Sequence, residues 1–341
     1  MIQHHVRVVA LAAAVLLLSA CAPCARCLSS AKDKTKDTKY PNWNYVETKI
    51  DDPFWWAELV GVKQAHANGV TGAGTTVAIV GTGVLRPHED LPNIAAGEAT
   101  CGKPPTSLDE TNGHGTQLAG IALGRADKSA HATFGVAPDA TLIPVKVDCG
   151  AVTAEALTKG IDAAIARTPD VILIAIGGYP AEPPGIHESI LERVIRNPKI
   201  LFVVASAWDG TNYVFPKWTQ ETNALLVAAM TFDAVEGDPK RLDKSKEIAY
   251  SSRRGDIWAP GRSVGTADVL PRGGRVHDQF LMHGTSPAAA IVAGCAALVK
   301  SKSPSGTGGA EIKEKLKKAA EEKPDIGPPP NIRLNCAQAV P

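Results

Sequence analysis

Residues 75–80 read TTVAIV and follow the glycine-containing segment GAG of residues 72–74. A continuous run of mainly β-branched residues after such a turn is typical of a strand buried on both faces of a sheet. Strands of this kind occur in sheets that carry helices on both sides. This stretch therefore predicts a buried strand of an α/β fold.

Other apolar runs along the chain predict further strands, at residues 141–147, 171–176, 200–205 and 224–230. Apolar residues recur at helical spacing in two segments between them, which predicts helices at residues 153–167 and 186–196. Strands that alternate with helices predict a mostly parallel sheet covered on both faces. Because no boundary interrupts this pattern, we expect one domain over residues 51–341.

The composition of the 341 residues is that of an ordinary globular protein, with 44% hydrophobic and 21% charged residues. The formal net charge is +1, without a basic stripe or an acidic tail. Nucleic-acid binding proteins usually carry clustered positive charge. The composition therefore argues against a nucleic-acid partner.

Residues 1–21 predict a lipoprotein-type signal peptide. Arg7 supplies a positive charge, and residues 8–18 form an apolar run that is too short to span a bilayer. The run ends at LSAC, residues 18–21, which resembles a bacterial lipobox. This implies cleavage before Cys21 and acylation of its thiol, which would hold the protein on a membrane. The alternative is a plain signal peptide cleaved near Ala20 or Ala22.

Residues 22–50 predict a polar tether, because the charges in KDKTKDTK at residues 32–39 alternate without an apolar period. Signal and tether together predict a cell-envelope lipoprotein on the periplasmic or extracellular face of a bacterial membrane. An exported compartment permits disulfides. Among the cysteines of the domain, Cys101 with Cys149 is the pair that we expect.

Two segments each place a reactive side chain beside glycine at the start of an apolar, helix-like run. They are NGHGTQLAG at residues 112–120 and HGTSPAAAIVAG at residues 283–294. A helix N-terminus offers free N–H groups and a positive dipole end, and a serine there is a nucleophile if an imidazole takes its proton. Ser286 and His114 are therefore candidate catalytic residues. For either segment taken alone, a helix cap is the simpler interpretation.

With VAIVGTGV at residues 77–84, these two segments resemble the subtilase family of serine peptidases. The segments GVAPDA at residues 135–140 and LNCA at residues 334–337 are similar to further family segments. The resemblance implies a subtilisin-like three-layer α/β fold, in which helices flank a mostly parallel sheet. It also implies acyl transfer to Ser286, with His114 as the base.

The first departure from the family pattern is at Gly81, where the family has its catalytic aspartate. That aspartate holds the imidazole in the correct tautomer and stabilises the imidazolium. In subtilisin, loss of this aspartate alone costs about 3 × 10⁴ in turnover. The sequence therefore predicts impaired catalysis.

A second departure affects the oxyanion hole. VVASAWDG at residues 203–210 resembles the family segment that contains the asparagine donor, and this donor falls on Trp208 or Asp209. An ionised aspartate would repel an oxyanion, whereas the indole N–H of tryptophan can donate. In subtilisin, loss of the donor costs about 10²–10³ in turnover.

Other carboxylates lie near the histidine or the glycine in the sequence, namely Asp90, Asp109 and Glu110. We expect each of them to be a surface or metal-facing residue rather than a substitute acid. The sequence predicts no bound cofactor and no zinc site. The resemblance allows calcium, although no calcium motif stands out.

The predicted peptide-binding strand matches the family pattern better than the catalytic segments do. AIGG, at Ala175, Ile176, Gly177 and Gly178, resembles the family strand that pairs with an extended substrate. Such pairing uses backbone groups and tolerates changes of side chain. The alternative is that the two glycines only form a turn at the end of a strand.

These observations predict an exported, membrane-anchored subtilase homologue that is catalytically impaired and binds peptide or protein segments. One alternative is an active serine endopeptidase in which another carboxylate orients His114. Another is a structural or assembly factor with a vestigial groove, which a groove plugged by residues 211–220 would favour.

Overall fold

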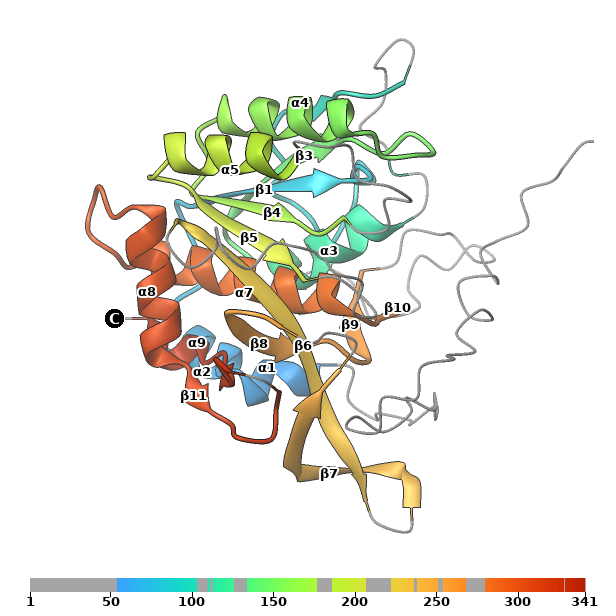
Figure 1. Cartoon of the computed structure of the whole chain (residues 1–341), viewed down its shortest axis with the longest axis vertical. Coiled ribbons are helices and arrows are strands. Elements are labelled where there is room, and N and C mark those ends of the chain that lie inside the picture. The colour runs from blue at the N-terminus through green and yellow to red at the C-terminus, as the bar shows by residue number, and fades with distance from the viewer. Residues whose placement is uncertain are drawn as a thin grey trace, which may run out of the picture. The chain divides into compact units, whose positions relative to one another are not determined.

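A computed structural model describes residues 54–102, 110, 113–125, 134–176, 186–206, 222–235, 238–250, 254–267, 280–327 and 329–340 (Figure 1). All of them belong to one compact unit, residues 46–341. The predicted signal peptide and the whole of the predicted tether lie outside the described residues. No helix in the described part of the chain is long and apolar enough to cross a membrane.

The main sheet of the described residues has ten strands, ordered β11-β12-β8-β6-β5-β4-β1-β3-β2, with β7 paired to β6. The pairs from β3 to β8 along this path are parallel. The strands are β1 (Thr76–Gly81), β2 (Glu98–Ala99), β3 (Thr141–Lys146), β4 (Val171–Ile174), β5 (Leu201–Ala205), β6 (Ala224–Val235), β7 (Asp238–Ala249), β8 (Ile257–Pro260), β11 (Glu321–Glu322) and β12 (Ile332–Arg333). A separate antiparallel pair consists of β9 (Val264–Thr266) and β10 (Phe280–Met282).

All five strands predicted from the sequence are present. β6 is longer than the predicted strand 224–230, because it continues to Val235 and pairs with β7 in an antiparallel hairpin. The sequence prediction did not include β7, whose segment is rich in charged residues and lacks the apolar run of a buried strand.

The predicted helices at residues 153–167 and 186–196 are α4 and α5, and the two glycine-flanked motifs open α3 and α7. In α4 the side chain of Thr153 caps the first turn by accepting a hydrogen bond from Ala156 N. The helices are α1 (Trp55–Leu59), α2 (Val62–Ala67), α3 (His114–Leu123), α4 (Ala154–Ile165), α5 (Ile186–Arg196), α7 (Thr285–Ser301), α8 (Gly309–Ala319) and α9 (Cys336–Ala339).

The sheet separates two apolar cores. Val77 and Ile79 of β1 face the core shared with α3 and α7, whereas Ala78 and Val80 face the core shared with α4 and α5. Figure 1 shows α4 and α5 on one side of the strands, and α3 and α7 on the other. This is the predicted three-layer α/β arrangement with a mostly parallel sheet.

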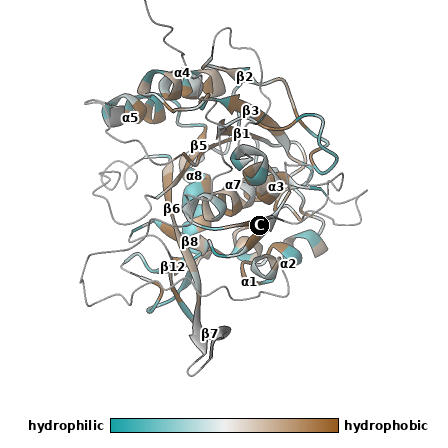
Figure 2. Ribbon diagram, turned by 90° about the vertical axis from the view of Figure 1, so that its right-hand side faces the viewer, coloured by the Kyte–Doolittle hydropathy of each residue, from teal (hydrophilic) through white to brown (hydrophobic). Residues whose placement is uncertain are grey.

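α7 is the central helix of the larger core. Almost all of its side chains are buried, and its ribbon in Figure 2 is mainly hydrophobic, like the strands beside it. A helix that is apolar on all sides is stable only when other elements surround it. The N-terminus of α7, which carries Ser286, is therefore held in a fixed place.

Two disulfides occur in the described residues. Cys101 is bonded to Cys149, which confirms the predicted pair and joins the segment after β2 to the segment after β3. Cys295 is bonded to Cys336, which joins α7 to α9 and was not predicted. The two cysteines of this second pair meet only because α7 and α9 pack beside each other in the fold.

The close packing of α7 against α3 leads to a prediction for Gly294→Ala. A Cβ at Gly294 would lie 2.5 Å from Val136 Cβ and 2.9 Å from Ala122 O. We expect the free energy of unfolding to fall by about 1–3 kcal/mol, which urea unfolding with intact disulfides would measure.

Gly81→Ala is the matched control, because an added Cβ there meets only Ile79 Cγ2 at 3.9 Å. Its free energy of unfolding should stay within about 0.5 kcal/mol of the natural protein. Equal stability of the two variants would contradict the tight contact at Gly294.

Candidate active site

The carboxyl end of β1 is the position at which the family resemblance places an acid. Gly81 is the last residue of β1 and lies opposite Lys146 of β3. A Cβ added to Gly81 would have only Ile79 Cγ2 within 4 Å. The end of β1 therefore lacks an acidic side chain, although the first carbon of one would fit there.

His114 opens α3, and the first turn of this helix lies against the segment that follows β1. Gly115 N donates a hydrogen bond of 2.8 Å to Thr82 Oγ1. A Cβ at Gly115 would lie 2.1 Å from Gly83 O, so this close approach requires glycine. The glycine after the histidine thus fixes His114 beside the end of β1.

Glu110 lies at the same place. Its Oε2 accepts hydrogen bonds from Thr82 Oγ1 at 2.9 Å and from Thr116 N at 3.0 Å. The free N–H groups and positive dipole end of α3 favour a carboxylate there. Glu110 is thus half-buried and tied both to the segment after β1 and to the first turn of α3.

The charge state of His114 follows from its surroundings. Burial lowers the pKa of His114 below its ordinary value, and the nearby carboxylates of Glu110 and Asp148 oppose this effect. A lowered pKa keeps the imidazole neutral at neutral pH, which is the form that accepts a proton. His114 is therefore suited to act as a base.

Ser286 lies in the first turn of α7, after a turn that the surrounding backbone fixes. Gly284 adopts φ 116°, and its N–H donates to Gly261 O at 2.7 Å. Thr285 Oγ1 donates to Ser206 O at 2.6 Å, just after the end of β5. The hydroxyl of Ser286 donates a long hydrogen bond of 3.5 Å to Ala175 O.

The first turns of α3 and α7, which carry the two reactive side chains, are tied to the ends of neighbouring strands. Val80 of β1 lies opposite Ile174 of β4, so Gly81 and Ala175 follow side by side at the carboxyl edge of the sheet. His114 is tied to the first of these strand ends through Gly115 and Thr82, and Ser286 to the second through Ala175. The fold thus brings the two predicted catalytic residues to one edge.

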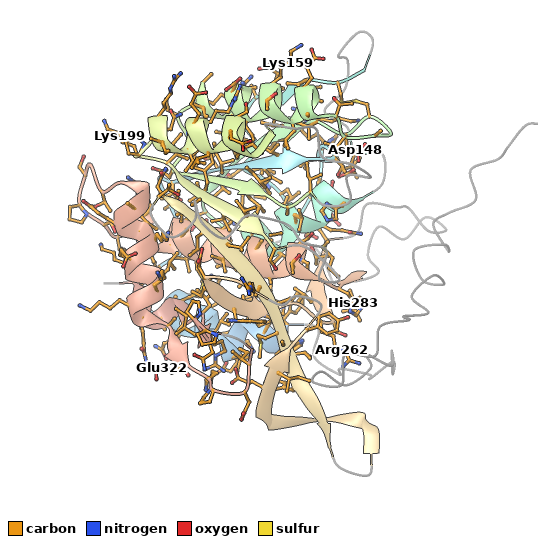
Figure 3. The ribbon with its side chains drawn as sticks, in the orientation of Figure 1. Asp148, Lys159, Lys199, Arg262, His283 and Glu322 are labelled. Carbon is orange, nitrogen blue, oxygen red and sulfur yellow. A yellow bond between two sulfur atoms is a disulfide. The ribbon has the colours of Figure 1, made fainter. Side chains whose placement is uncertain are left out.

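A second carboxylate reaches this edge from β3. Asp148 follows the end of β3, its Oδ1 accepts a hydrogen bond of 2.9 Å from Gly150 N, and the adjacent Cys149 forms the disulfide to Cys101. In Figure 3, Asp148 and His283 lie on the side of the molecule toward which the arrow of β1 points. Asp148 acts on His114 through its charge.

Residues 72–332 match the subtilase family, peptidase S8. The chain belongs to the subtilase family. The serine protease AprX of Bacillus subtilis is 30% identical over 319 residues, which cover 83% of this chain and 70% of AprX. Subtilisin Savinase of Lederbergia lenta is 31% identical over 272 residues, which cover 78% of this chain and 90% of Savinase.

Solved structures have the same fold. The A-subunit of the AB5 toxin from E. coli aligns with a TM-score of 0.65 at 20% identity, over 84% of this subtilase and 97% of the toxin chain. At this identity the likeness concerns the fold alone. The family itself implies peptide or protein substrates.

Several predicted site residues lie outside the described residues of this subtilase. They are Trp208 and Asp209 of the predicted oxyanion hole, Gly177 and Gly178 of the predicted peptide-binding strand, and the predicted lipidation residue Cys21. The other two residues of the peptide-binding strand follow β4, where Ala175 is buried and Ile176 is half-buried.

The other expectations concern the carboxylates Asp90 and Asp109 and a bound metal ion. Asp90 is only 7% exposed, so the expectation of a surface position is wrong for this residue. Asp109 lies outside the described residues. Within the described ranges, His, Cys, Asp and Glu form no group of three or more that could hold a metal ion.

Sequence reasoning missed Thr82 and Asp148. Thr82 follows the glycine that replaces the acid. The residue is 5% exposed, and its hydroxyl joins Glu110 to Gly115. Asp148 comes directly before a cysteine predicted to form a disulfide, which is the signal that could have marked its loop as fixed.

His283, which directly precedes Gly284 and lies three residues before Ser286, makes the turn sensitive to acid. Its Nδ1 accepts a hydrogen bond of 3.2 Å from Ser263 N. Burial, together with the positive charge of Arg262, lowers the pKa of His283 to about 4. A protonated ring nitrogen cannot accept this hydrogen bond.

This pKa predicts the stability of the subtilase in acid. Between about pH 4 and the ordinary histidine pKa of about 6.5, the unfolded chain holds a proton that the native His283 does not hold. The free energy of unfolding should therefore decrease as the pH falls through this window, by at most about 3 kcal/mol from this residue. Urea unfolding at pH 7.5 and 4.5 would measure the decrease.

The comparison variant is His283→Asn, whose carboxamide oxygen can accept from Ser263 N without titrating. Because the other acid-sensitive groups are common to both proteins, the variant should lose less stability between the two pH values. An equal loss would show that His283 is not responsible.

Proposed function

We propose that this chain is an exported, membrane-anchored subtilase that binds peptide segments at a catalytically impaired serine site. The proposal rests on one observation. Gly81 lies at the carboxyl end of β1, where the family has its acid. The neighbouring groups for acyl transfer are retained. The protein therefore combines a nucleophile and a base with an incomplete charge arrangement.

The chemistry of such a site is acyl transfer. Ser286 Oγ attacks the carbonyl carbon of a peptide bond, and its proton passes to the neutral imidazole of His114. The imidazolium then gives this proton to the leaving amine, and water hydrolyses the acyl-enzyme. Without an aspartate at position 81, the imidazolium is less stabilised and its tautomer is less well fixed, so each proton transfer is slower.

Peptide binding depends less on the missing acid. The segment after β4 begins with Ala175, whose carbonyl accepts from Ser286 Oγ, and Ile176 follows it. A bound peptide in extended conformation would pair with backbone groups of this segment beyond the end of β4. Such binding keeps a peptide beside Ser286 whether or not it is cleaved.

Export and anchoring are supported by the lipobox-like segment ending at Cys21. The disulfides between Cys101 and Cys149 and between Cys295 and Cys336 fit an oxidising compartment. A relative that is 28% identical over 280 residues is named the minor extracellular protease Epr of Bacillus subtilis. These observations agree with a protein that acts outside the cytoplasm.

The first test is Gly81→Asp in the full chain. The added Cβ has room, and the new carboxylate would stand where the family places its acid, so we expect kcat/KM for peptide hydrolysis to rise about 10²–10⁴-fold. Labelling by a fluorophosphonate and hydrolysis of a fluorogenic peptide library would measure the change.

Ser286→Ala in both backgrounds is the control, and it should abolish labelling and cleavage. If the natural protein cleaves peptides as fast as the Gly81→Asp variant, it is an active peptidase and the proposed impairment is wrong. If neither protein is labelled, the remaining interpretation is a structural or assembly factor with a vestigial groove.

The anchor predicts an effect of Cys21→Ser in the bacterial host. We expect this variant to lose incorporation of radioactive palmitate and to leave the membrane fraction, because the acylated thiol is absent. Cys24→Ser is the matched control and should keep both properties. Equal acylation of the two variants would show that Cys21 is not the lipidated residue.

A further inference from the structure

Glu110 is hydrogen-bonded within the candidate active site, where its carboxylate can act on His114, the candidate base. Its Oε2 is bound by Thr82 Oγ1 at 2.9 Å and by Thr116 N at 3.0 Å, and Thr82 Oγ1 in turn accepts from Gly115 N at 2.8 Å. Gly115 and Thr116 directly follow His114 in the sequence, and Thr82 directly follows Gly81. The carboxylate is thereby fixed to the same two segments that position the imidazole.

The Glu110 carboxylate is held at the N-terminal end of α3 by one O–H donor, the Thr82 hydroxyl, and one N–H donor, Thr116 N. Among the carboxylates of the described residues, those that act on His114 are Glu110, whose effect is the larger, and Asp148 from the loop after β3. β1 adds none because it ends at Gly81, and the first turn of α7 holds no acidic residue.

We infer that Glu110 is a positioning residue of this site, whose charge compensates the charge that His114 gains when it accepts the proton of Ser286. This inference rests on the proposed serine chemistry. In the family pattern this compensation comes from the aspartate whose place Gly81 takes. Because the hydrogen bonds of Glu110 hold it in place before the reaction, its charge acts without reorganisation.

A purely structural role for Glu110 predicts different behaviour. As a cap of α3, Glu110 would satisfy Thr116 N and contribute to stability, and its charge would not matter for Ser286. Glu110→Gln separates the two roles. The amide oxygen can still accept from Thr82 and Thr116, whereas the negative charge is removed.

The experiment measures the rate of fluorophosphonate labelling of Ser286 against pH, in the full chain and in the Gly81→Asp background. Glu110→Gln should slow labelling about ten- to a hundredfold in the natural sequence, which is the scale of the pKa change from one nearby opposite charge. In the Gly81→Asp background the loss should be less than about threefold, because the new aspartate supplies the charge.

A second readout does not depend on activity. NMR of the full chain with ¹³C-labelled histidine, with His114→Gln to assign the signal, follows the titration of His114 directly. Glu110→Gln should lower the pKa of His114, Asp148→Asn should lower it less, and Glu110→Asp should restore part of the natural value.

Two outcomes overturn the inference. One is an unchanged His114 pKa in Glu110→Gln, with a lowered melting temperature as the only effect. The other is an equal loss of labelling in both backgrounds, which a purely structural role would produce. If Ser286 is labelled in neither background, the proposed function fails, and the His114 titration still decides whether Glu110 supplies the charge.

Discussion

The parallel register of β1 with β3 and β4 fixes where the reactive groups of this protein lie. Gly81 is opposite Lys146 on one side, and Val80 is opposite Ile174 on the other. All carboxyl ends of these strands therefore meet at one edge, and the segments that follow them are forced together. α3 and α7 begin at this edge because their glycines permit close contact with the strand ends.

The same constraint explains how the geometry of the site is held without the acid. Neither helix is held through a side chain at position 81, because α3 is tied by Gly115 to Thr82 and α7 by Thr285 to Ser206. Two carboxylates, Glu110 and Asp148, remain close enough to act on His114. The residues that hold the two helices are thus different from the carboxylates that act on His114.

Much of the fold was predictable because buried parallel strands and amphipathic helices leave clear patterns. The run at residues 75–80 and the spacing in residues 153–167 correspond to β1 and α4. The short strands β2, β11 and β12 have two residues each and leave no pattern, and β7 is polar. The disulfide Cys295–Cys336 depends on the meeting of two helices and not on spacing.

The sequence by itself determined the family, the candidate nucleophile and base, and the glycine at the position of the acid, because each depends on residue types within a short motif. Only the tertiary structure decided that the charges of Glu110 and Asp148 act on His114. A carboxylate four residues before a histidine, or in the loop after another strand, acts through space, and its effect depends on hydrogen bonds and burial that a sequence does not display. Thr82, which no motif marks as chemical, joins the first of them to α3.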